Sequence, residues 1–219
     1  VFSHHTLVGD GGRGEVWRAT HRDGVDSVAI KWRAGDRAND ERFAKAFLSE
    51  VRAVSKLLHS MIINVIDYGH VSEQEAADSN GRLSKGSQWL AMEYADCGTL
   101  TKHCGKLDWP QIRKILLQLL DALGHAHARG VIHRDIKPGN IMLRGPGDPP
   151  AEIVLTDFGL AHIWSNEEKP LLEAGWLGTT SFMAPEQFDS NADRIGSWTD
   201  MYGIGCLAWA LITGTAPFS

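Results

Sequence analysis

The sequence has few cysteines, and their spacing excludes two classes of small structural domain. Cys97, Cys104 and Cys206 are the three cysteines among 219 residues, and no two of them form a CxxC pair. A disulfide framework or a zinc site needs more cysteines at close, regular spacings. The ten histidines also form no metal-binding motif. This usage is typical of a reducing compartment, so we expect a cytoplasmic location.

An excess of positive charge is also missing. The net charge is -5 and the pI is near 6.0, which argues against a nucleic-acid or anionic-membrane partner. The opening residues, VFSHHTLVGD, do not form a signal peptide. The uncharged stretch from Met201 onward is nearly long enough to cross a bilayer, but Gly203, Gly205, Gly214 and Pro217 interrupt it. We therefore interpret it as a buried core helix and expect no membrane span within this chain.

Three glycines near the start mark a candidate phosphate-binding loop. Gly9, Gly11 and Gly14 have GxGxxG spacing, and Val16 follows them. In a dinucleotide-binding βαβ unit the last glycine opens a helix, whereas the residues that follow here, EVWRA, favour a strand. The glycines therefore predict a hairpin, in which backbone N–H groups can approach phosphates without side-chain collision.

A lysine and a glutamate in the next two segments form a candidate ion pair. Residues 27–32, SVAIKW, alternate as a strand, and Lys31 lies on the same face as Ala29. Residues 41–58 predict a helix, and Glu50 lies on its apolar stripe with Phe43, Phe47, Val51, Val54 and Leu58. Breaking a buried ion pair on one side costs about 3–5 kcal/mol, so Glu50 needs a cation there. Lys31 is the expected partner; the alternative is that Glu50 reaches solvent at the edge of the stripe.

The other elements follow from turn and cap signals. Asp108 and Gln111 have the spacing of a capping box and start a helix that is expected to end near Gly130. Its expected apolar face consists of Ile112, Ile115, Leu116, Leu119, Leu120 and Leu123. We expect strands at residues 62–68, 89–94, 141–143 and 153–155, an exposed hairpin loop at 71–88, a turn at 144–150 and a further helix from about residue 198.

The stretch HRDIKPGN, residues 133–140, gathers the residue types that phosphoryl transfer needs. Asp135 could accept a proton from a hydroxyl group, and Lys137 could neutralise a phosphoryl group in transfer. Asn140 and Asp157, which follows the strand 153–155, could hold a metal ion together. Taken alone, the stretch is also compatible with a polar surface turn.

The chain resembles the protein kinase family along essentially its whole length. The resemblance rests on six features that occur in the family's order: the glycine loop, SVAIKW, Glu50, HRDIKPGN, TDFG and MAPE. Lys137 and the segment GTTSFMAPE resemble its serine/threonine branch, and the style of the motifs is similar to bacterial kinases. The resemblance implies an α+β, two-lobed fold with an antiparallel N-lobe sheet, one main N-lobe helix and a mostly helical C-lobe. Residues 1–94 would form the N-lobe, 95–98 the hinge and 99–219 the C-lobe of a single catalytic domain.

The resemblance also implies a role for each matching residue, with ATP and Mg²⁺ as cofactors. Lys31 would hold the α and β phosphates, Glu50 would position Lys31, Asp135 would act as base, and Lys137 would contact the γ phosphate. Asn140 and Asp157 would bind Mg²⁺. The nucleotide contacts would come from Gly9, Gly11, Gly14, Val16, Ala29, Met92 as gatekeeper, the backbones of Glu93 and Ala95, and Met142. Thr179 would line the groove for a protein substrate, while His133, Phe158 and Val54 would form a packed spine.

Two other activities are alternatives to that of a protein serine/threonine kinase. A small-molecule kinase of the aminoglycoside type shares the Asp and Asn but usually lacks the segment from Gly178 to Glu186. A catalytically impaired fragment or pseudokinase-like scaffold is the alternative, because the chain ends at Ser219 without the later C-lobe helices and the arginine they would supply to Glu186. We also expect Trp209, Leu211 and Ile212 to be exposed and to promote oligomerisation. The chain could form the cytoplasmic part of a larger membrane-anchored kinase.

Regulation is expected to depend little on phosphorylation of the segment after Asp157. Between Gly159 and Gly178 the one hydroxyl residue is Ser165, while Glu167, Glu168 and Glu173 supply fixed negative charge. We expect Glu173 to pair with Arg134, and Thr180 is the alternative, as a phosphorylation site.

Overall fold

The computed structural model describes residues 2–11, 14–21, 27–32, 41–79, 83–147, 150–158, 180–188 and 194–218. The chain divides into two compact units, Val1–Lys56 with Asn64–Tyr94, and Leu57–Ile63 with Ala95–Ser219. The first unit is mainly an antiparallel sheet and the second is mainly helical, as the α+β expectation requires.

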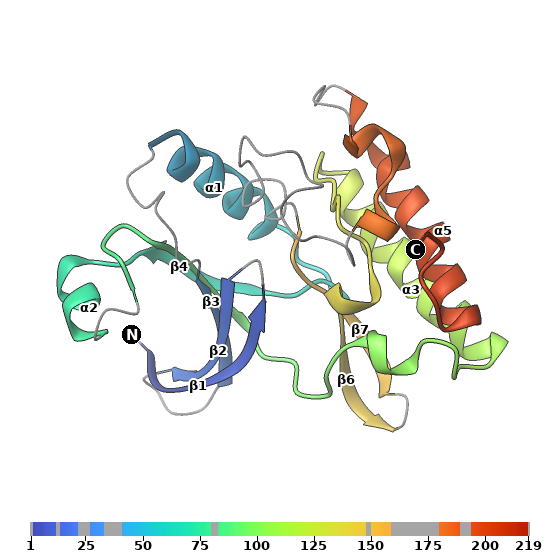
Figure 1. Ribbon diagram of the computed structural model, residues 1–219, viewed down its shortest axis with the longest axis horizontal. Coiled ribbons are helices and arrows are strands. Elements are labelled where there is room, and N and C mark those ends of the chain that lie inside the picture. The colour runs from blue at the N-terminus through green and yellow to red at the C-terminus, as the bar shows by residue number, and fades with distance from the viewer. Residues whose placement is uncertain are drawn as a thin grey trace. The chain divides into compact units, whose positions relative to one another are not determined.

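The first unit is built on a five-stranded antiparallel sheet in the order β1-β2-β3-β5-β4 (Figure 1). Its strands are β1 (Phe2–Gly11), β2 (Gly14–His21), β3 (Ser27–Trp32), β4 (Val65–His70) and β5 (Gln88–Glu93). The alternation of SVAIKW sends Val28 and Ile30 to one face, where they form a buried cluster with Ala19 and Ala91. Trp32 and Trp89 pack against this cluster, so the predicted strand and the shared face of Val28, Ile30 and Trp32 are confirmed.

The two helices of this unit differ from the expectation in length and in number. Helix α1 (Glu41–Val54) ends four residues early, and Leu58 is 76% exposed rather than part of the apolar stripe. The segment expected to be an open hairpin loop contains helix α2 (Glu73–Asp78). Ser72 caps α2, and Glu75 completes the capping box.

The segment expected to start a strand at residue 62 instead joins the second unit. Ile63 donates its N–H to the Leu155 carbonyl, and Leu155 donates its N–H to the Met61 carbonyl, each at 2.9 Å. These bonds attach residues 61–63 beside strand β7 (Pro150–Leu155), so β4 starts only at Val65. The expected N-lobe, residues 1–94, includes residues 57–63, whereas these residues cluster with the second unit.

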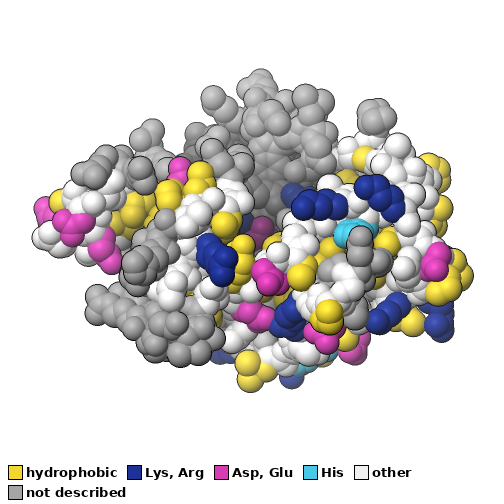
Figure 2. Space-filling view, turned by 90° about the horizontal axis from the view of Figure 1, so that it is seen from below, with side chains coloured by type: hydrophobic (Ala, Val, Ile, Leu, Met, Phe, Trp, Pro, Cys, Tyr) yellow, Lys and Arg dark blue, Asp and Glu magenta, His cyan; other side chains and the backbone are white. Residues whose placement is uncertain are grey.

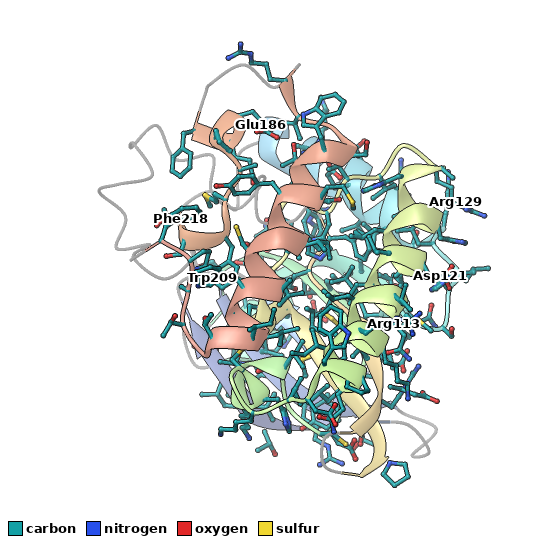
Figure 3. The ribbon with its side chains drawn as sticks, turned by 90° about the vertical axis from the view of Figure 1, so that its right-hand side faces the viewer. Arg113, Asp121, Arg129, Glu186, Trp209 and Phe218 are labelled. Carbon is teal, nitrogen blue, oxygen red and sulfur yellow. The ribbon has the colours of Figure 1, made fainter. Side chains whose placement is uncertain are left out.

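The second unit is organised around helices α3 (Trp109–His127) and α5 (Ser197–Thr213), which pack side by side (Figures 1 and 3). Asp108 caps α3 and Gln111 completes its capping box, as predicted. The hairpin of β6 (Ile141–Gly147) and β7 follows the candidate catalytic loop. Short 3₁₀ helices complete the unit: η1 (Leu100–His103), η2 (Pro138–Asn140), η3 (Thr180–Phe182) and η4 (Pro185–Phe188).

Three expectations for this unit are wrong in detail. Helix α3 stops at His127, because the chain turns over residues 128–130 and Gly130 adopts a left-handed φ of 72°. Leu120 on α3 is 40% exposed and lies outside its buried face. The expected turn at 144–150 is shorter, since β6 extends to Gly147 and β7 begins at Pro150.

Helix α5 is buried on one side and apolar on its exposed side as well. Leu207 and Leu211 are fully buried, which makes the expected exposure of Leu211 wrong. Met201, Trp209 and Ile212 are 40%, 52% and 58% exposed; we call these three residues the α5 apolar face. Figure 3 shows Trp209 on the side of α5 away from α3. Within the ranges described, no helix is long and apolar enough to cross a bilayer.

Candidate active site

The glycine loop and Lys31 lie in register across three strands of the first unit. Gly9 on β1 pairs with Val16 on β2, and Val16 pairs with Lys31 on β3. Gly11 and Gly14 pair where the hairpin closes. An added Cβ on Gly9 would lie 3.7 Å from the Val16 Cβ, so a larger side chain at Gly9 would fill the space beside Val16. The strand register thus brings the glycines, Val16 and Lys31 together.

Lys31 is unusually well buried for a lysine, with 5% of its surface exposed. Glu50 is half-buried on α1, between the buried residues Phe47 and Val51. A lysine is almost never this buried unless it is paired, which is consistent with the expected ion pair. The Lys31–Glu50 contact itself remains a prediction.

The residues expected around an adenine base are divided between the units: Ala29, Met92 and Glu93 belong to the first unit, and Ala95 and Met142 belong to the second. Ala29 pairs with Met92, and the two residues are 8% and 5% exposed. The Glu93 N–H donates to the Asn64 carbonyl at 3.0 Å. Ala95, in the second unit, is buried. Met142, also in that unit, is half-buried on β6.

Asp135 is the centre of the candidate catalytic loop. Its side chain is buried, and its Oδ2 atom lies 3.2 Å from the Lys137 Nζ atom. The Asn140 Nδ2 group donates to the same Oδ2 at 2.5 Å and to the Asp135 carbonyl at 2.8 Å. The predicted acid, cation and amide are therefore in direct contact, and the carboxylate is fixed on one side by two donors.

The same bonds set the direction of the Asn140 amide. Because its NH₂ group faces Asp135, its carbonyl oxygen faces the opposite way and can act as a ligand. Asp157 follows β7 in a left-handed conformation with φ of 66°. Mg²⁺ favours one or two protein oxygen ligands completed by phosphate and water. One amide oxygen and one carboxylate are oxygen donors of this kind, so Asn140 and Asp157 fit a Mg²⁺ ion that is bound jointly with phosphate. In the part of the chain that the structure describes, no three His, Cys, Asp or Glu side chains form a metal cage.

Asp200 on α5 anchors the loop, a role that the sequence analysis did not assign. Its Oδ2 atom accepts from the His133 N–H at 2.9 Å, and its Oδ1 atom accepts from the Arg134 N–H at 2.7 Å. The His127 Nε2 group donates to Oδ2 at 2.7 Å. Asp200 is 1% exposed, so one buried carboxylate serves three donors. The contacts span 66 residues or more, and no local sequence pattern predicts them.

Gly203 lets α5 approach the loop closely. An added Cβ at Gly203 would lie 2.8 Å from the Ile136 Cβ, a distance that real Cβ atoms do not reach. The helix that carries Asp200 can therefore pack directly under residue 136.

His133 fixes the far side of the loop. Its Nδ1 atom accepts from the Asp135 N–H at 3.2 Å, so its Nε2 group carries the proton and donates to the Thr156 carbonyl at 2.9 Å. Its ring packs against Phe158, with centroids 4.6 Å apart. His133 and Phe158 are 0% and 1% exposed. The histidine thus links the backbone of Asp135 to the residue that precedes Asp157.

The segment before α5 is attached both to α5 and to the loop. Glu186 on η4 accepts from the Thr199 hydroxyl at 2.7 Å (Figure 3 labels Glu186 near the start of α5). Gln187 donates its Nε2 group to the Arg134 carbonyl at 2.7 Å. Thr180 is half-buried at the start of η3. Gly159, Ser165, Glu167, Glu168, Glu173 and Thr179 lie outside the described residues.

Cys97, within the expected hinge, does not have the character of a nucleophile. Its thiol donates to the Asp96 Oδ1 atom at 3.3 Å, and this bond, with burial and the nearby charge, raises the pKa of Cys97. A raised thiol pKa leaves less thiolate at neutral pH, which disfavours covalent catalysis.

Comparisons with known proteins identify the family of the chain. The protein kinase domain family matches residues 2–219. The chain is 34% identical to serine/threonine-protein kinase pkn3 of Myxococcus xanthus, over 97% of this chain and 37% of that protein. It is 32% identical to serine/threonine-protein kinase PknF of Mycobacterium tuberculosis, over 100% of this chain and 44% of that protein. It thus spans less than half the length of these curated relatives.

Solved structures show the same fold. The kinase domain of Mycobacterium tuberculosis PknI superimposes with a TM-score of 0.72 at 26% sequence identity, covering 100% of this chain and 76% of that domain. The predicted α+β kinase fold is therefore confirmed. On the evidence of its sequence, its fold and the arrangement of Asp135, Lys137 and Asn140, the chain belongs to the protein kinase domain family, with bacterial serine/threonine kinases among its relatives.

Proposed function

We propose that the chain transfers the γ-phosphate of ATP to serine or threonine hydroxyls of protein substrates. The observation that carries the proposal is the Asp135 carboxylate, held through Oδ2 by Lys137 and Asn140. A fixed carboxylate can orient a substrate hydroxyl and accept its proton as the phosphoryl group moves. Lys137, beside it, would neutralise charge on the transferring group.

Nucleotide contacts are proposed for each unit by itself. Gly9, Gly11, Gly14 and Val16 would contact the phosphates and base, and Lys31, positioned by Glu50, would bind the α and β phosphates. Ala29, Met92 and Met142 would pack on the adenine, with the Glu93 carbonyl and the Ala95 N–H as its hydrogen-bond partners. Asn140 and Asp157 would hold Mg²⁺, which supplies charge neutralisation at the phosphates.

The proposed substrate class rests on residues 180–188, which contain η3 and η4 and which we call the substrate segment. The residues of η3 and η4 are tied to the catalytic loop through Gln187, which supports a fixed surface for a peptide next to Asp135. Thr179 would line that groove. The names of the relatives support serine and threonine as acceptors. The three free cysteines support a cytoplasmic location for this chain, either by itself or as part of a larger membrane-anchored protein.

Regulation would depend on charge near Arg134. We propose Glu173 as its resident partner and Thr180 as the alternative, a phosphorylated residue. Mass spectrometry of the purified protein and the activity of phosphatase-treated protein distinguish the two. If phosphatase abolishes activity and Thr180→Ala has the same effect, phosphorylation control replaces the acidic partner.

The proposed activity is tested by incubating the protein with γ-labelled ATP, Mg²⁺ and a serine- and threonine-containing protein such as casein. We expect label on phosphoserine or phosphothreonine, and none with Lys31→Met. Incorporation that is unchanged in Lys31→Met would show a contaminating kinase, and no incorporation at all would contradict the proposal. We also propose that copies of this chain associate through the α5 apolar face.

A further inference from the structure

Gln187 forms a bridge between two backbone groups that lie far apart in the sequence. Its Oε1 atom accepts from the Ala184 N–H at 2.9 Å, and its Nε2 group donates to the Arg134 carbonyl at 2.7 Å. The second bond spans 53 residues. Both ends of one half-buried amide are thus used, one within the substrate segment and one on the catalytic loop.

The backbone at Arg134 needs hydrogen bonds such as this one to keep its conformation. Arg134 has a φ of 66°, a left-handed conformation that is unfavourable for a residue other than glycine and needs surrounding contacts to persist. Its N–H is held by Asp200 at 2.7 Å, and its carbonyl is held by Gln187 at 2.7 Å. The next N–H, that of Asp135, donates to the His133 Nδ1 atom. The backbone that leads into Asp135 is therefore fixed by three side chains, and Gln187 is the one that comes from the substrate segment.

Gln187 itself is held in place by its neighbours. The Ala184 N–H orients its amide, and the adjacent Glu186 accepts from the Thr199 hydroxyl at 2.7 Å. Thr199 precedes Asp200 on α5, so η4 and the catalytic loop share one support. A shift of η4 would therefore move the donor away from the Arg134 carbonyl.

We infer that Gln187 is a positioning residue for Asp135: it fixes the Arg134 carbonyl and makes the orientation of the catalytic carboxylate depend on the placement of the substrate segment. The inference rests on the proposed kinase activity. It implies that a correctly placed η4 is needed for the phosphoryl-transfer step and not for ATP binding, because within the described ranges the side chain of Gln187 bonds to Ala184 and Arg134, neither of which is assigned to the nucleotide.

Two variants of matched size separate the bonds of Gln187. Gln187→Glu retains an oxygen for the Ala184 N–H and loses the donor to Arg134, whereas Gln187→Met loses both groups. Gln74 on α2 provides the control, because its Nε2 group donates to the Asp78 Oδ1 atom at 3.0 Å on an exposed helix of the first unit. Gln74→Glu makes the same chemical change far from Asp135 in the sequence.

The readouts are kcat, the KM for ATP, and amide hydrogen exchange of peptides covering residues 131–140. We expect kcat to fall roughly 10–100-fold in both Gln187 variants, the loss typical of a displaced catalytic group. The KM for ATP should change less than about twofold, and exchange in 131–140 should be faster than in wild type and in Gln74→Glu.

Hydrogen exchange decides the inference independently of activity. Wild-type exchange of residues 131–140 in Gln187→Glu overturns it, and so does an active wild type whose kcat is unchanged by that variant. An inactive wild type contradicts the proposed function instead, and the exchange comparison then still determines whether Gln187 holds the loop.

Discussion

Asp200 and Arg134 are joined by a hydrogen bond of 2.7 Å from the Arg134 N–H to the Asp200 Oδ1 atom, at a residue with a left-handed φ of 66°. The bond connects the start of α5 to the residue directly before Asp135. Because Asp200 also accepts from the His133 N–H, two consecutive backbone groups have the same carboxylate as acceptor. The buried side chain of Asp200 thus fixes the backbone at the start of the catalytic loop.

Replacing this carboxylate should destabilise the second unit. We expect Asp200→Ala to lower the free energy of unfolding by about 3 kcal/mol or more, since two buried N–H groups lose their acceptor and each orphaned group costs roughly 1–3 kcal/mol. Asp200→Asn retains one oxygen and should lose less stability. Urea unfolding followed by circular dichroism measures the free energy of unfolding of both variants. Equal stability of wild type and Asp200→Ala would show that the bonds to His133 and Arg134 are dispensable.

The expected Lys31–Glu50 pair can be tested by a double-mutant cycle. If the two residues touch, Glu50→Gln and Lys31→Met should weaken ATP binding non-additively, with a coupling energy of about 0.5–3 kcal/mol. Calorimetric titration of ATP into the four proteins gives the value. Additive losses would mean that Glu50 reaches solvent at the edge of its helix.

The pH dependence of stability should carry a contribution from His125. Its ring packs against His59, with centroids 5.0 Å apart, and the Asp121 Oδ2 atom lies 3.3 Å from the His59 Nε2 atom. Burial, the Arg129 charge and His59 lower the pKa of His125 below 6.5, while Asp121 raises it by a smaller amount. Protonation is therefore easier in the unfolded chain.

The sign of this effect follows from proton linkage. As the pH falls below 6.5, the unfolded state binds the His125 proton first, so stability decreases with falling pH. We expect wild type to lose more stability than His125→Gln between pH 7.5 and about pH 5, as measured by urea midpoints. A parallel pH dependence of the two proteins would assign the effect to other groups.

The α5 apolar face should promote self-association of the 219-residue chain. Met201, Trp209 and Ile212 are spaced along one exposed side of the helix, and Phe218 is also 58% exposed. Figure 3 shows Trp209 and Phe218 on the same side of α5, and Figure 2 shows charged and apolar side chains interspersed on one face of the molecule. Contiguous exposed apolar surface favours association.

Light scattering coupled to size-exclusion chromatography measures this association. The pair Trp209→Glu and Ile212→Lys leaves the net charge unchanged and should shift the protein toward monomer. Trp109→Glu changes a tryptophan on α3 that is 61% exposed, compared with 52% for Trp209, and should have no such effect. A wild-type chain that is monomeric and has a high melting temperature would contradict the prediction.

Local signals in the sequence predicted much of the fold, and the errors have physical causes. The alternation of SVAIKW and the capping box of Asp108 and Gln111 act within a few residues, and both were assigned correctly. The capping box of Ser72 and Glu75 was overlooked because helix α2 is polar and buries no residue, so it lacks the apolar periodicity that marks other helices. The assignment of Ile62 failed because its bridge to Leu155 is a long-range contact.

The sequence predicts which residues make up the candidate site. It does not predict the hydrogen bonds from other segments that hold those residues in place. Asp135, Lys137 and Asn140 lie within six residues of one another, so their proximity is almost guaranteed by the turn at Pro138. The bonds from Asp200 and Gln187 to Arg134 cross 66 and 53 residues. They depend on how α5 and η4 pack, which no short sequence pattern specifies.

The central claim, that Asp135 acts on the phosphoryl acceptor, is tested most directly by Asp135→Asn. The change is isosteric and removes the charge that orients the hydroxyl and accepts its proton. With ATP, Mg²⁺ and a serine-containing peptide, we expect kcat to fall roughly 10²–10⁴-fold while the Kd for ATP is retained, because a transition-state interaction is lost and ground-state binding is not. Asp78→Asn, an exposed change on α2, should have neither effect. Peptide phosphorylation by Asp135→Asn at the wild-type rate would contradict the account.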